Sequence, residues 1–340
     1  MKLGGGRRRL QKFRPDAGTT FGVTKPKILV IRGGAIGDFI LTLPAIAALR
    51  RQFPRAHLEV LGYPHIVQLA VAGGLVDRAQ PIEARGLASF FARAGELAAE
   101  LTDYFSEFDI IISYLYDPDD IFRTNVGRCL HGQFIVAPHR PDESERLHAT
   151  KVYLRPLERL AIFDADPVPR LAIRSPLRAA PKPGAGGATL KQLALHPGSG
   201  SETKNWPEAK WAQLLAQLVD SSNLNFLLVG GEAEGERLER LAAVLPPERM
   251  QVARSLPLAE LAQQLELCVG FVGHDSGISH LAAALGLPCL FLWADTIEEI
   301  WRPQGDRLAI VREAAGVRAI SVERVLAELT AMLQPATERA

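Results

Sequence analysis

Residues 271–281 read FVGHDSGISHL, and this stretch decides the fold class that we expect for the chain. The apolar run Cys268–Val272 is typical of a buried strand, and the run Leu281–Leu285 is typical of a helix. A buried strand that turns directly into a helix is the repeating unit of an α/β sheet with parallel strands. We therefore expect an α/β protein.

The turn in this stretch places small and polar residues at the start of the helix. Ser276 and Gly277 lie there, where unpaired backbone N–H groups and the helix dipole favour an anion. Gly277 lets a ligand approach the backbone closely, and His280, one turn further on, adds a donor. The pattern predicts a phosphate site, and the alternative is a helix that Asp275 or Ser276 caps without any ligand.

A second turn of the same kind, at residues 196–207, reads HPGSGSETKNWP. It follows the short apolar strand Gln192–Leu195 and precedes an expected helix. The backbone around Ser199 and Gly200 can wrap an anion, and Lys204 adds a mobile point charge suited to a diphosphate. The alternative is an ordinary flexible turn with a solvated lysine.

A third turn follows the first apolar strand, where residues 27–38 read KILVIRGGAIGD. A dinucleotide-binding fingerprint that started at Gly33 would need glycine at position 35 and glycine or alanine at position 38, but Ala35 and Asp38 stand there. A carboxylate at that place would repel a pyrophosphate. Asp38 is therefore either a helix cap or a carboxylate presented at the end of a parallel strand, available as a general base.

At these three places the sequence resembles glycosyltransferase family 9, the ADP-heptose:lipopolysaccharide heptosyltransferases. The family's R-x-x-x-[IL]-G-D pattern and the L-T-x-P-A-like helix after it match residues 32–45. Its H-P-G-[SA] and K-x-W-P patterns match within 196–207, and its [GN]-x-D-[ST]-G-x-x-H-L-A-A-A-L-G-x-P pattern matches 273–288. The resemblance spans about residues 25–330 in the family's order.

The resemblance implies a GT-B fold, in which two Rossmann-like domains with parallel sheets face each other across a cleft. It implies that Asp38 is the catalytic base on the first, acceptor-side domain. Asp275 would contact the transferred sugar, and Glu232 would lie near the ribose of the nucleoside. The residues that would hold the donor phosphates are Ser199, Gly200, Lys204, Ser276, Gly277 and His280.

The segment at 175–187 is rich in proline, glycine and alanine, and it predicts a linker between two domains. We expect a first domain at 25–174, a nucleotide-sugar-binding domain at 188–320, and a C-terminal helix and tail at 321–340 that packs back on the first domain. The basic residues of 1–24 predict a disordered tail, with attachment to an anionic membrane surface as the alternative.

Apolar runs that alternate with helical patterns predict the strands of the two sheets. The expected strands lie near 27–32, 57–61, 109–113 and 133–137 in the first half, and near 192–196, 225–230, 250–253, 268–272, 288–292 and 308–311 in the second. The expected helices of the first half lie near 39–52, 64–73, 86–103, 119–130 and 145–162.

Charged residues after the third and fourth strands of the first half concern the acceptor. The D-x-D pattern at Asp117 and Asp119 is more simply explained by Asp119 as a helix cap than by a metal site. Cations at the edge of a cleft suit an anionic acceptor, and ordinary surface charge is the alternative. The acceptor-side candidates are Gly37, Asp117, Arg123, His139 and Arg140.

Composition limits the class of protein. A net charge of +1 argues against a dedicated nucleic-acid binder. The three cysteines are an odd number without metal-ligand spacing, which indicates core residues in a reducing compartment. No signal peptide is apparent, and the longest apolar stretch, Leu281–Ala294, is too short to span a bilayer. We expect a cytoplasmic monomer whose only membrane contact is peripheral, at the inner membrane.

These observations together predict an inverting, metal-independent glycosyltransferase without a cofactor. It would move a heptose or similar sugar from an ADP-sugar donor to an anionic glycolipid acceptor, the lipopolysaccharide inner core or a related cell-surface glycan. A transferase of the same fold that uses another nucleotide sugar is the first alternative. An NAD-dependent oxidoreductase is disfavoured by Asp38, and so is a catalytically silent nucleotide-sugar-binding protein.

Overall fold

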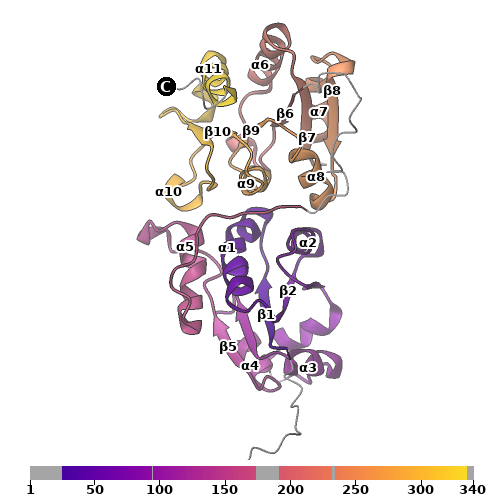
Figure 1. The fold of residues 1–340 in the computed structure, drawn as a ribbon, viewed down its shortest axis with the longest axis vertical. Helices are drawn as coiled ribbons and strands as arrows, with labels where there is room; N and C mark the ends of the chain where they lie inside the picture. The colour runs from indigo at the N-terminus through magenta and orange to yellow at the C-terminus, as the bar shows by residue number, and fades with distance from the viewer. Residues whose placement is uncertain (1–24, 94, 174–190, 232–233, 335–340) are drawn as a thin grey trace, which may run out of the picture.

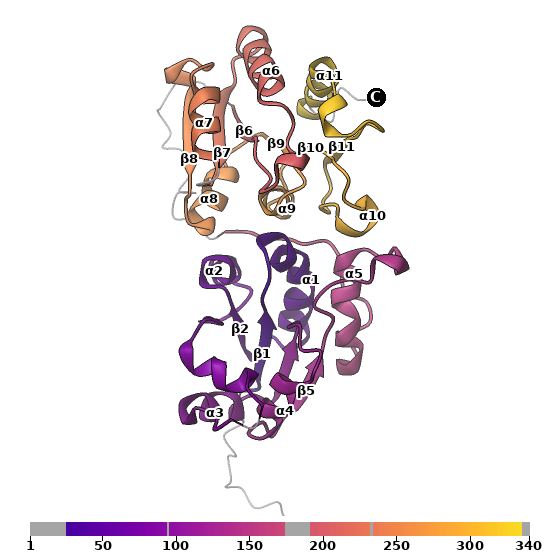
Figure 2. The ribbon, with the colours of Figure 1, turned by 180° about the vertical axis from the view of Figure 1, so that it is seen from behind.

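The computed structural model describes residues 25–93, 95–173, 191–231 and 234–334, and Figures 1 and 2 show two parallel sheets stacked end to end. The first sheet has five strands in the order β3-β2-β1-β4-β5. We call the part of the chain built on it the first domain. Its strands are β1 (Lys27–Arg32), β2 (His57–Gly62), β3 (Arg78–Pro81), β4 (Ile110–Ser113) and β5 (Gln133–Val136).

The continuous apolar sequence of β1 is explained by helices on both faces of the sheet. Ile28 and Val30 belong to one buried cluster with α1, α2 and α5, whereas Leu29 and Ile31 belong to another with the aromatic residues of α3 and α4. The helical segments of this domain are α1 (Ile36–Gln52), α2 (Pro64–Ala72), η1 (Arg85–Phe91), α3 (Ala99–Ser106), α4 (Ile121–Gly127), η2 (Glu143–Glu145), α5 (Ala149–Leu154) and η3 (Arg155–Leu160).

The second sheet has six parallel strands in the order β11-β10-β9-β6-β7-β8, and it defines the second domain. Its strands are β6 (Gln192–His196), β7 (Asn225–Gly230), β8 (Met250–Arg254), β9 (Gly270–His274), β10 (Cys289–Leu292) and β11 (Leu308–Val311). Its helical segments are η5 (Glu202–Lys204), α6 (Glu208–Ser221), α7 (Gly235–Ala242), η7 (Pro247–Arg249), α8 (Leu258–Leu265), α9 (Gly277–Ala284), α10 (Glu298–Trp301), η8 (Val317–Ala319) and α11 (Val322–Leu333). The expected α/β class with two parallel sheets is confirmed.

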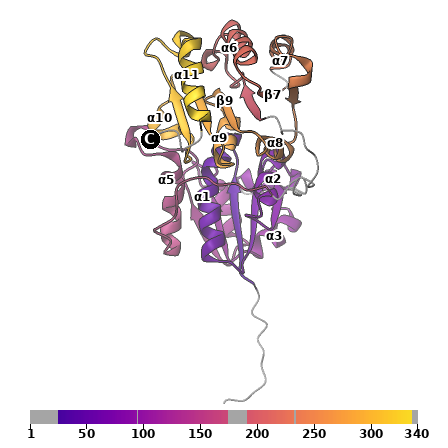
Figure 3. The ribbon, with the colours of Figure 1, turned by 45° about the horizontal axis from the view of Figure 1, so that its top comes forward.

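The two domains meet where α8 and α9 lie over α2 and α1 (Figure 3). The starts of α1 and α9 are in close contact there. A Cβ added to Gly277 would lie 2.6 Å from Cβ of Ile36, and a Cβ added to Gly37 would lie 3.3 Å from Cδ2 of His280. Glycine at both positions therefore allows α1 and α9 to approach this closely. Each helix follows the strand at which its sheet changes winding direction, which is where open parallel sheets bind ligands.

Several expected elements differ from the observed ones. The helix expected at 86–103 is divided into η1 and α3, with Gly95 between them, because glycine is poorly suited to a helix interior. The helix expected at 145–162 consists of α5 and then η3. Strand β3 was not expected, because its residues RAQP are largely polar and β3 lies at the edge of the sheet.

The expectation that the C-terminal helix packs on the first domain is wrong. Helix α11 buries Val325 and Leu329 in a cluster with Trp206 and Trp211 of the second domain, because its apolar stripe faces α6 and the sheet there. The chain has already reached the second domain by Leu171, whose N–H donates to the Ala284 carbonyl at 2.8 Å. The expected linker at 175–187 and the basic tail at 1–24 lie outside the described residues.

Within the described ranges, no helix is both long enough and apolar enough to cross a membrane.

Candidate active site

A cavity of about 970 Å³ lies between the two domains. The turns after β1, β4 and β5 line it from the first domain, and the turns after β6, β9 and β10 line it from the second. All three turns singled out in the sequence, at residues 33–38, 196–207 and 275–280, contribute to this one site. Parallel strands bring their carboxyl ends to the same edge of each sheet, and the two edges face each other across the cavity.

Asp38 both caps a helix and faces the cavity. It lies in the first turn of α1, where its Oδ2 accepts the N–H of Ala35 at 3.1 Å. Its Oδ1 lies 3.5 Å from Nη2 of Arg32, and 30% of its side chain is exposed. The two alternatives drawn from the sequence are thus compatible, since one oxygen stabilises the helix start and the other remains available at the cavity wall.

Arg32 is the buried cation that accompanies Asp38. Its Nη1 donates to the carbonyl of His139 at 2.8 Å, and its guanidinium carbon lies 4.6 Å from the centroid of the Tyr153 ring. Only 3% of Arg32 is exposed. A buried guanidinium held on several sides is a fixed positive charge beside the carboxylate. We gave it no role from the sequence, although an arginine that ends a buried apolar strand is a signal that was available.

Lys204 and Asp275 form an ion pair, with Nζ 2.7 Å from Oδ2. The hydroxyl of Thr296, in the turn after β10, donates to the same carboxylate oxygen. Asp275 is 8% exposed, so two donors on one oxygen offset much of the cost of burying its charge. The structure brings two of the expected donor-side residues into contact, and Thr296 is a partner that the sequence motifs did not identify.

The start of α9 places the first backbone N–H groups of a helix beside a buried histidine. Ser276 is the N-cap, and its Oγ accepts the N–H of Ser279 at 3.3 Å. His280 is 6% exposed, and its Nδ1 has no hydrogen-bond partner among the described residues. Burial lowers the pKa of His280 to about 4, although the carboxylates of Asp275 and Asp38 oppose this effect. His280 is therefore neutral near pH 7, and it can donate a hydrogen bond to an anion but adds no charge.

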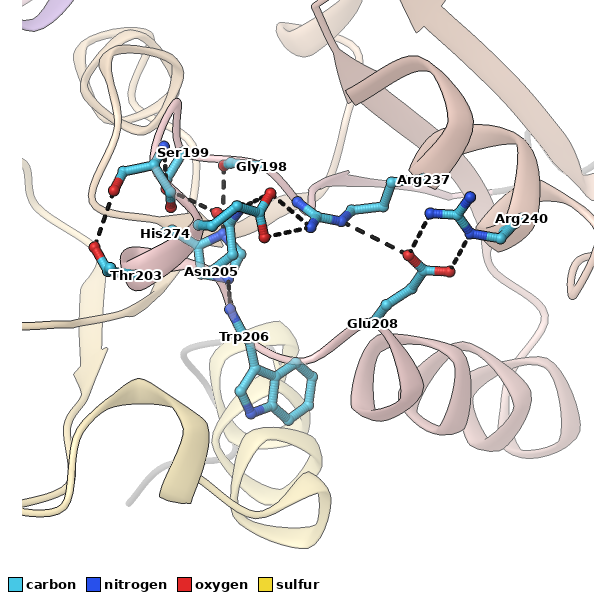
Figure 4. Close-up of polar contacts among 11 residues, drawn as sticks. Gly198, Ser199, Thr203, Asn205, Trp206, Glu208, Arg237, Arg240 and His274 are labelled. Atoms are coloured by element: carbon cyan, nitrogen blue, oxygen red, sulfur yellow. Dashed lines mark hydrogen bonds and ion pairs between the residues drawn. The ribbon is translucent and has the colours of Figure 1, made fainter. Parts of the chain in front are cut away.

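The turn after β6 is internally hydrogen-bonded (Figure 4). The Ser199 hydroxyl lies 2.7 Å from Oδ1 of Asn205 and 2.8 Å from the carbonyl of Ser201, so its single proton is used inside the turn. Gly200 adopts a φ of +75°, which favours glycine. Ser199 still lines the cavity, where its backbone can meet a ligand.

A second cavity, of about 290 Å³, lies on the other side of Ser199, Ser276 and Gly277, which line both cavities. Its walls are largely aliphatic, and Ile36 of the first domain is one of them. The carboxylate that lines it is Glu234, which is 9% exposed and accepts the N–H of Gly231 at 2.9 Å. Glu232, the acidic residue expected near the ribose, lies outside the described residues.

The acceptor-side candidates are divided by the structure. Gly37, His139 and Arg140 line the large cavity. Asp117 and Arg123 are not among its lining residues. Asp117 accepts the backbone N–H groups of Phe122 and Arg123 at 3.1 and 2.9 Å. Asp117 therefore caps α4, and the expectation that Asp119 does so is wrong.

Arg140 connects the two domains at the cavity. Its guanidinium carbon lies 5.2 Å from the centroid of the Trp301 ring, which belongs to the second domain. Nη2 of Arg140 lies 3.7 Å from Oε1 of Glu143, and the same oxygen accepts the indole N–H of Trp301 at 3.1 Å. Arg140 thus has both an aromatic and an acidic partner, and Trp301 is a cavity residue that the sequence analysis missed.

Comparison with known proteins gives the family. The family model described as glycosyltransferase family 9 (heptosyltransferase) matches residues 144–326, more than half of the chain. The chain belongs to glycosyltransferase family 9. Several relatives match segments of it. It is 42% identical over 94 residues to lipopolysaccharide heptosyltransferase 1 of Pseudomonas aeruginosa, and 27% identical over 150 residues to lipopolysaccharide heptosyltransferase 2 of Escherichia coli K12. These segments cover 28% and 38% of the chain, and 26% and 43% of the two relatives.

Solved structures show the same fold over nearly the whole chain. The E. coli heptosyltransferase WaaC with ADP has a TM-score of 0.72 and 19% identity, covering 90% of this chain and 99% of that one. The E. coli ADP-heptose LPS heptosyltransferase II also has a TM-score of 0.72, with 20% identity, covering 92% of this chain and 100% of that one. This family 9 member therefore has the GT-B fold.

Proposed function

We propose that this family 9 member transfers a heptose or a similar sugar from an ADP-sugar to the lipopolysaccharide inner core or a related cell-surface glycan, with inversion at the anomeric carbon. The observation that carries the proposal is the shared cavity. A carboxylate of the first domain, Asp38, and an anion-binding arrangement of the second domain, at Lys204 and the start of α9, line the same space. A base and a leaving-group site on opposite walls suit a single displacement.

The second domain would hold the donor. The start of α9 at Ser276 and Gly277 and the turn at Ser199 offer backbone N–H groups, and Lys204 offers a charge, to the two phosphates. Gly200 of the same turn lines the smaller cavity and would meet the donor from that side. The smaller aliphatic cavity adjoins these groups and would take the nucleoside, with Glu234 as the carboxylate for ribose hydroxyls.

The remaining contacts of the donor follow from this arrangement. Because Asp275 is paired with Lys204, a bound diphosphate would share that lysine with the carboxylate. Asp275 would then lie where the transferred sugar joins the phosphate.

The chemical step needs one proton acceptor and one stabilised leaving group. The acceptor hydroxyl attacks the anomeric carbon from the face opposite the nucleotide, its proton passes to Asp38, and the bond from that carbon to the β-phosphate oxygen breaks. ADP leaves with its charge spread over the N–H groups at Ser276 and Gly277, the neutral His280 and Lys204. One displacement inverts the configuration, and the protein donors alone balance the departing charge.

His139 and Arg140 lie on the acceptor side of the cavity, and we assign them to an anionic glycolipid acceptor. A phosphate or carboxylate of the acceptor would compete with the Glu143 carboxylate for Arg140, because each of these anions can accept two hydrogen bonds from a guanidinium. We place the reaction on the cytoplasmic side of the inner membrane, where the glycolipid acceptor would be reached by a monomer in peripheral contact with the bilayer.

The test is a transfer assay with ADP-heptose and a deacylated inner-core acceptor, together with calorimetry of ADP, UDP, GDP, CMP and NAD. We expect ADP to bind most tightly and the product to carry the inverted linkage by NMR. Tighter binding of another nucleotide diphosphate would favour a different sugar donor, and binding of NAD alone would exclude the proposed reaction.

A further inference from the structure

His274, the last residue of β9, is a buried polar residue that has no role in the site described above. It is completely buried and hydrogen-bonds to the turn after β6 at two points (Figure 4). Its Nε2 lies 2.9 Å from the backbone nitrogen of Trp206, and its Nδ1 lies 3.3 Å from the carbonyl oxygen of Gly198. These two backbone groups stand at the start and at the end of the turn that carries Ser199 and Lys204.

The partners determine the protonation state of the ring. A backbone N–H can only donate, so Nε2 of His274 must accept from Trp206. The single ring proton is then on Nδ1, where it donates to the carbonyl of Gly198. Burial lowers the pKa of His274 to about 3, with the Gly198 carbonyl and Asp275 opposing and His196 and Arg237 adding to this effect. The imidazole is therefore neutral and can make both bonds at once near pH 7.

The turn between these two points is also held by the Lys204–Asp275 ion pair and by bonds among its own side chains. Its internal bonds run from Ser199 to Asn205 and from Asn205 to Glu202, whose carboxylate binds Arg237 of α7 at 2.8–2.9 Å. Figure 4 shows Arg237 on the side of the turn away from Thr203. These contacts brace the turn against a neighbouring helix, whereas His274 joins its two ends to the strand that leads into Asp275 and α9.

We propose that His274 is a positioning residue for the donor diphosphate: by bridging Gly198 and Trp206 it holds the turn of Ser199 and Lys204 in register with Asp275 and the start of α9. This inference rests on the proposed donor site. Lys204 reaches Asp275 at 2.7 Å only while the two turns keep this spacing. Without the bridge, the Trp206 N–H and the Gly198 carbonyl would have no hydrogen-bond partner in the interior. The turn would then change its conformation so that these two groups find other partners.

The decisive experiment compares ADP binding by calorimetry in full-length His274→Leu and Trp211→Phe. His274→Leu removes both hydrogen bonds. Trp211→Phe is the matched control, because the Trp211 ring packs against the His274 ring at 5.5 Å and is fully buried, but its indole N–H bonds to no described residue. We expect the ADP Kd to rise about tenfold or more in His274→Leu, equivalent to about 1.4 kcal/mol. In Trp211→Phe we expect a lower Tm with an unchanged Kd.

Two further variants, each of which can keep one of the two hydrogen bonds, keep the test valid if His274→Leu does not fold. His274→Asn places an amide near the site of Nδ1, and His274→Gln places one near the site of Nε2, so each can keep one of the two bonds. We expect both Kd values to fall between those of wild type and His274→Leu. In kinetics, KM for the donor should rise more than kcat falls, because the substitution acts on the phosphate turn and not on Asp38.

The outcomes separate this inference from the proposed function. If His274→Leu binds ADP like wild type, or if Trp211→Phe loses as much affinity, His274 is a packing residue only. If wild type does not bind ADP, and Lys204→Ala therefore does not differ from it, the proposed donor site itself is refuted. The nitrogen NMR shifts of His274 in wild type give an independent check. A proton on Nε2, or titration between about pH 5 and 8, would overturn the proposed bridge.

Discussion

Replacing Asp38 by asparagine tests the assignment of the base, because the structure separates the two roles of its carboxylate. Asparagine keeps an oxygen that can accept the N–H of Ala35, which Asp38 accepts at 3.1 Å. It loses the charge that faces Arg32 at 3.5 Å. Because the Arg32 side chain is only 2% exposed, losing the charge opposite it costs more than losing an exposed ion pair, about 1–3 kcal/mol of stability. The carbonyls of His139 and residue 38 still accept from the guanidinium, so Asp38→Asn should fold.

Transfer by Asp38→Asn should fall steeply although the variant folds. Loss of a positioned general base lowers the rate by about 10²–10⁴-fold. Asp38 lies on the first domain, and the groups proposed to hold ADP lie on the second, so the Kd of ADP should change less than about twofold. The assay is single-turnover transfer from ADP-heptose to the deacylated acceptor, followed by mass spectrometry, with calorimetry of ADP on the same preparation.

Two further variants distinguish chemistry from helix capping. Asp38→Ala removes the cap acceptor as well, so it should lose about 1 kcal/mol more stability than Asp38→Asn but no more activity. Asp142→Asn is the matched control, because Asp142 also caps a helical turn, accepting the N–H of Ser144 at 2.9 Å, but does not line the cavity. It should transfer at the wild-type rate. Near wild-type transfer by Asp38→Asn would show that Asp38 is a cap alone.

Three other predictions follow from the site. Lys204→Ala should weaken ADP binding by about 1.5–3 kcal/mol, or about 10–150-fold in Kd by calorimetry, because a charge-assisted contact is lost; an unchanged Kd would refute the assignment of this turn. His196, His274 and His280 have pKa values lowered by burial to about 4, about 3 and about 4, so the unfolded chain binds more protons than the native one as pH falls below the ordinary histidine pKa of about 6.5. Urea unfolding should therefore show stability falling between about pH 6.5 and pH 4, by up to about 1.4 kcal/mol per pH unit for each histidine, and stability that is flat there would contradict their burial as neutral groups. Gly277→Ala should force α9 and α1 apart locally, because the new Cβ would lie 2.6 Å from Cβ of Ile36 and 3.1 Å from the backbone nitrogen of Gly37; thermal unfolding should show a lower Tm, and a wild-type Tm with full activity would show that the contact is dispensable.

Local sequence was sufficient to predict the parallel strands and the three turns that end in the cavity. Runs such as that of β1 are apolar on both faces, and a strand buried on both sides needs no tertiary information to be recognised. The turns at Asp38, Lys204 and Ser276 were also predictable, since small residues between a strand and a helix leave backbone donors free wherever they occur.

Contacts between segments far apart in the chain were decided by the tertiary structure alone. Pairing of Lys204 with Asp275, the buried position of His280 against Gly37, and the meeting of Arg140 with Trp301 each join segments that are at least 71 residues apart. The position of α11 on the second sheet was also decided by the tertiary structure. An apolar stripe indicates that one face of a helix is buried, but it does not indicate which surface covers that face. The sequence identified Asp38 and the donor turns, and it carried a signal for Arg32 at the end of a buried strand. His274 and Thr296 could be recognised only once the fold had placed their partners beside them.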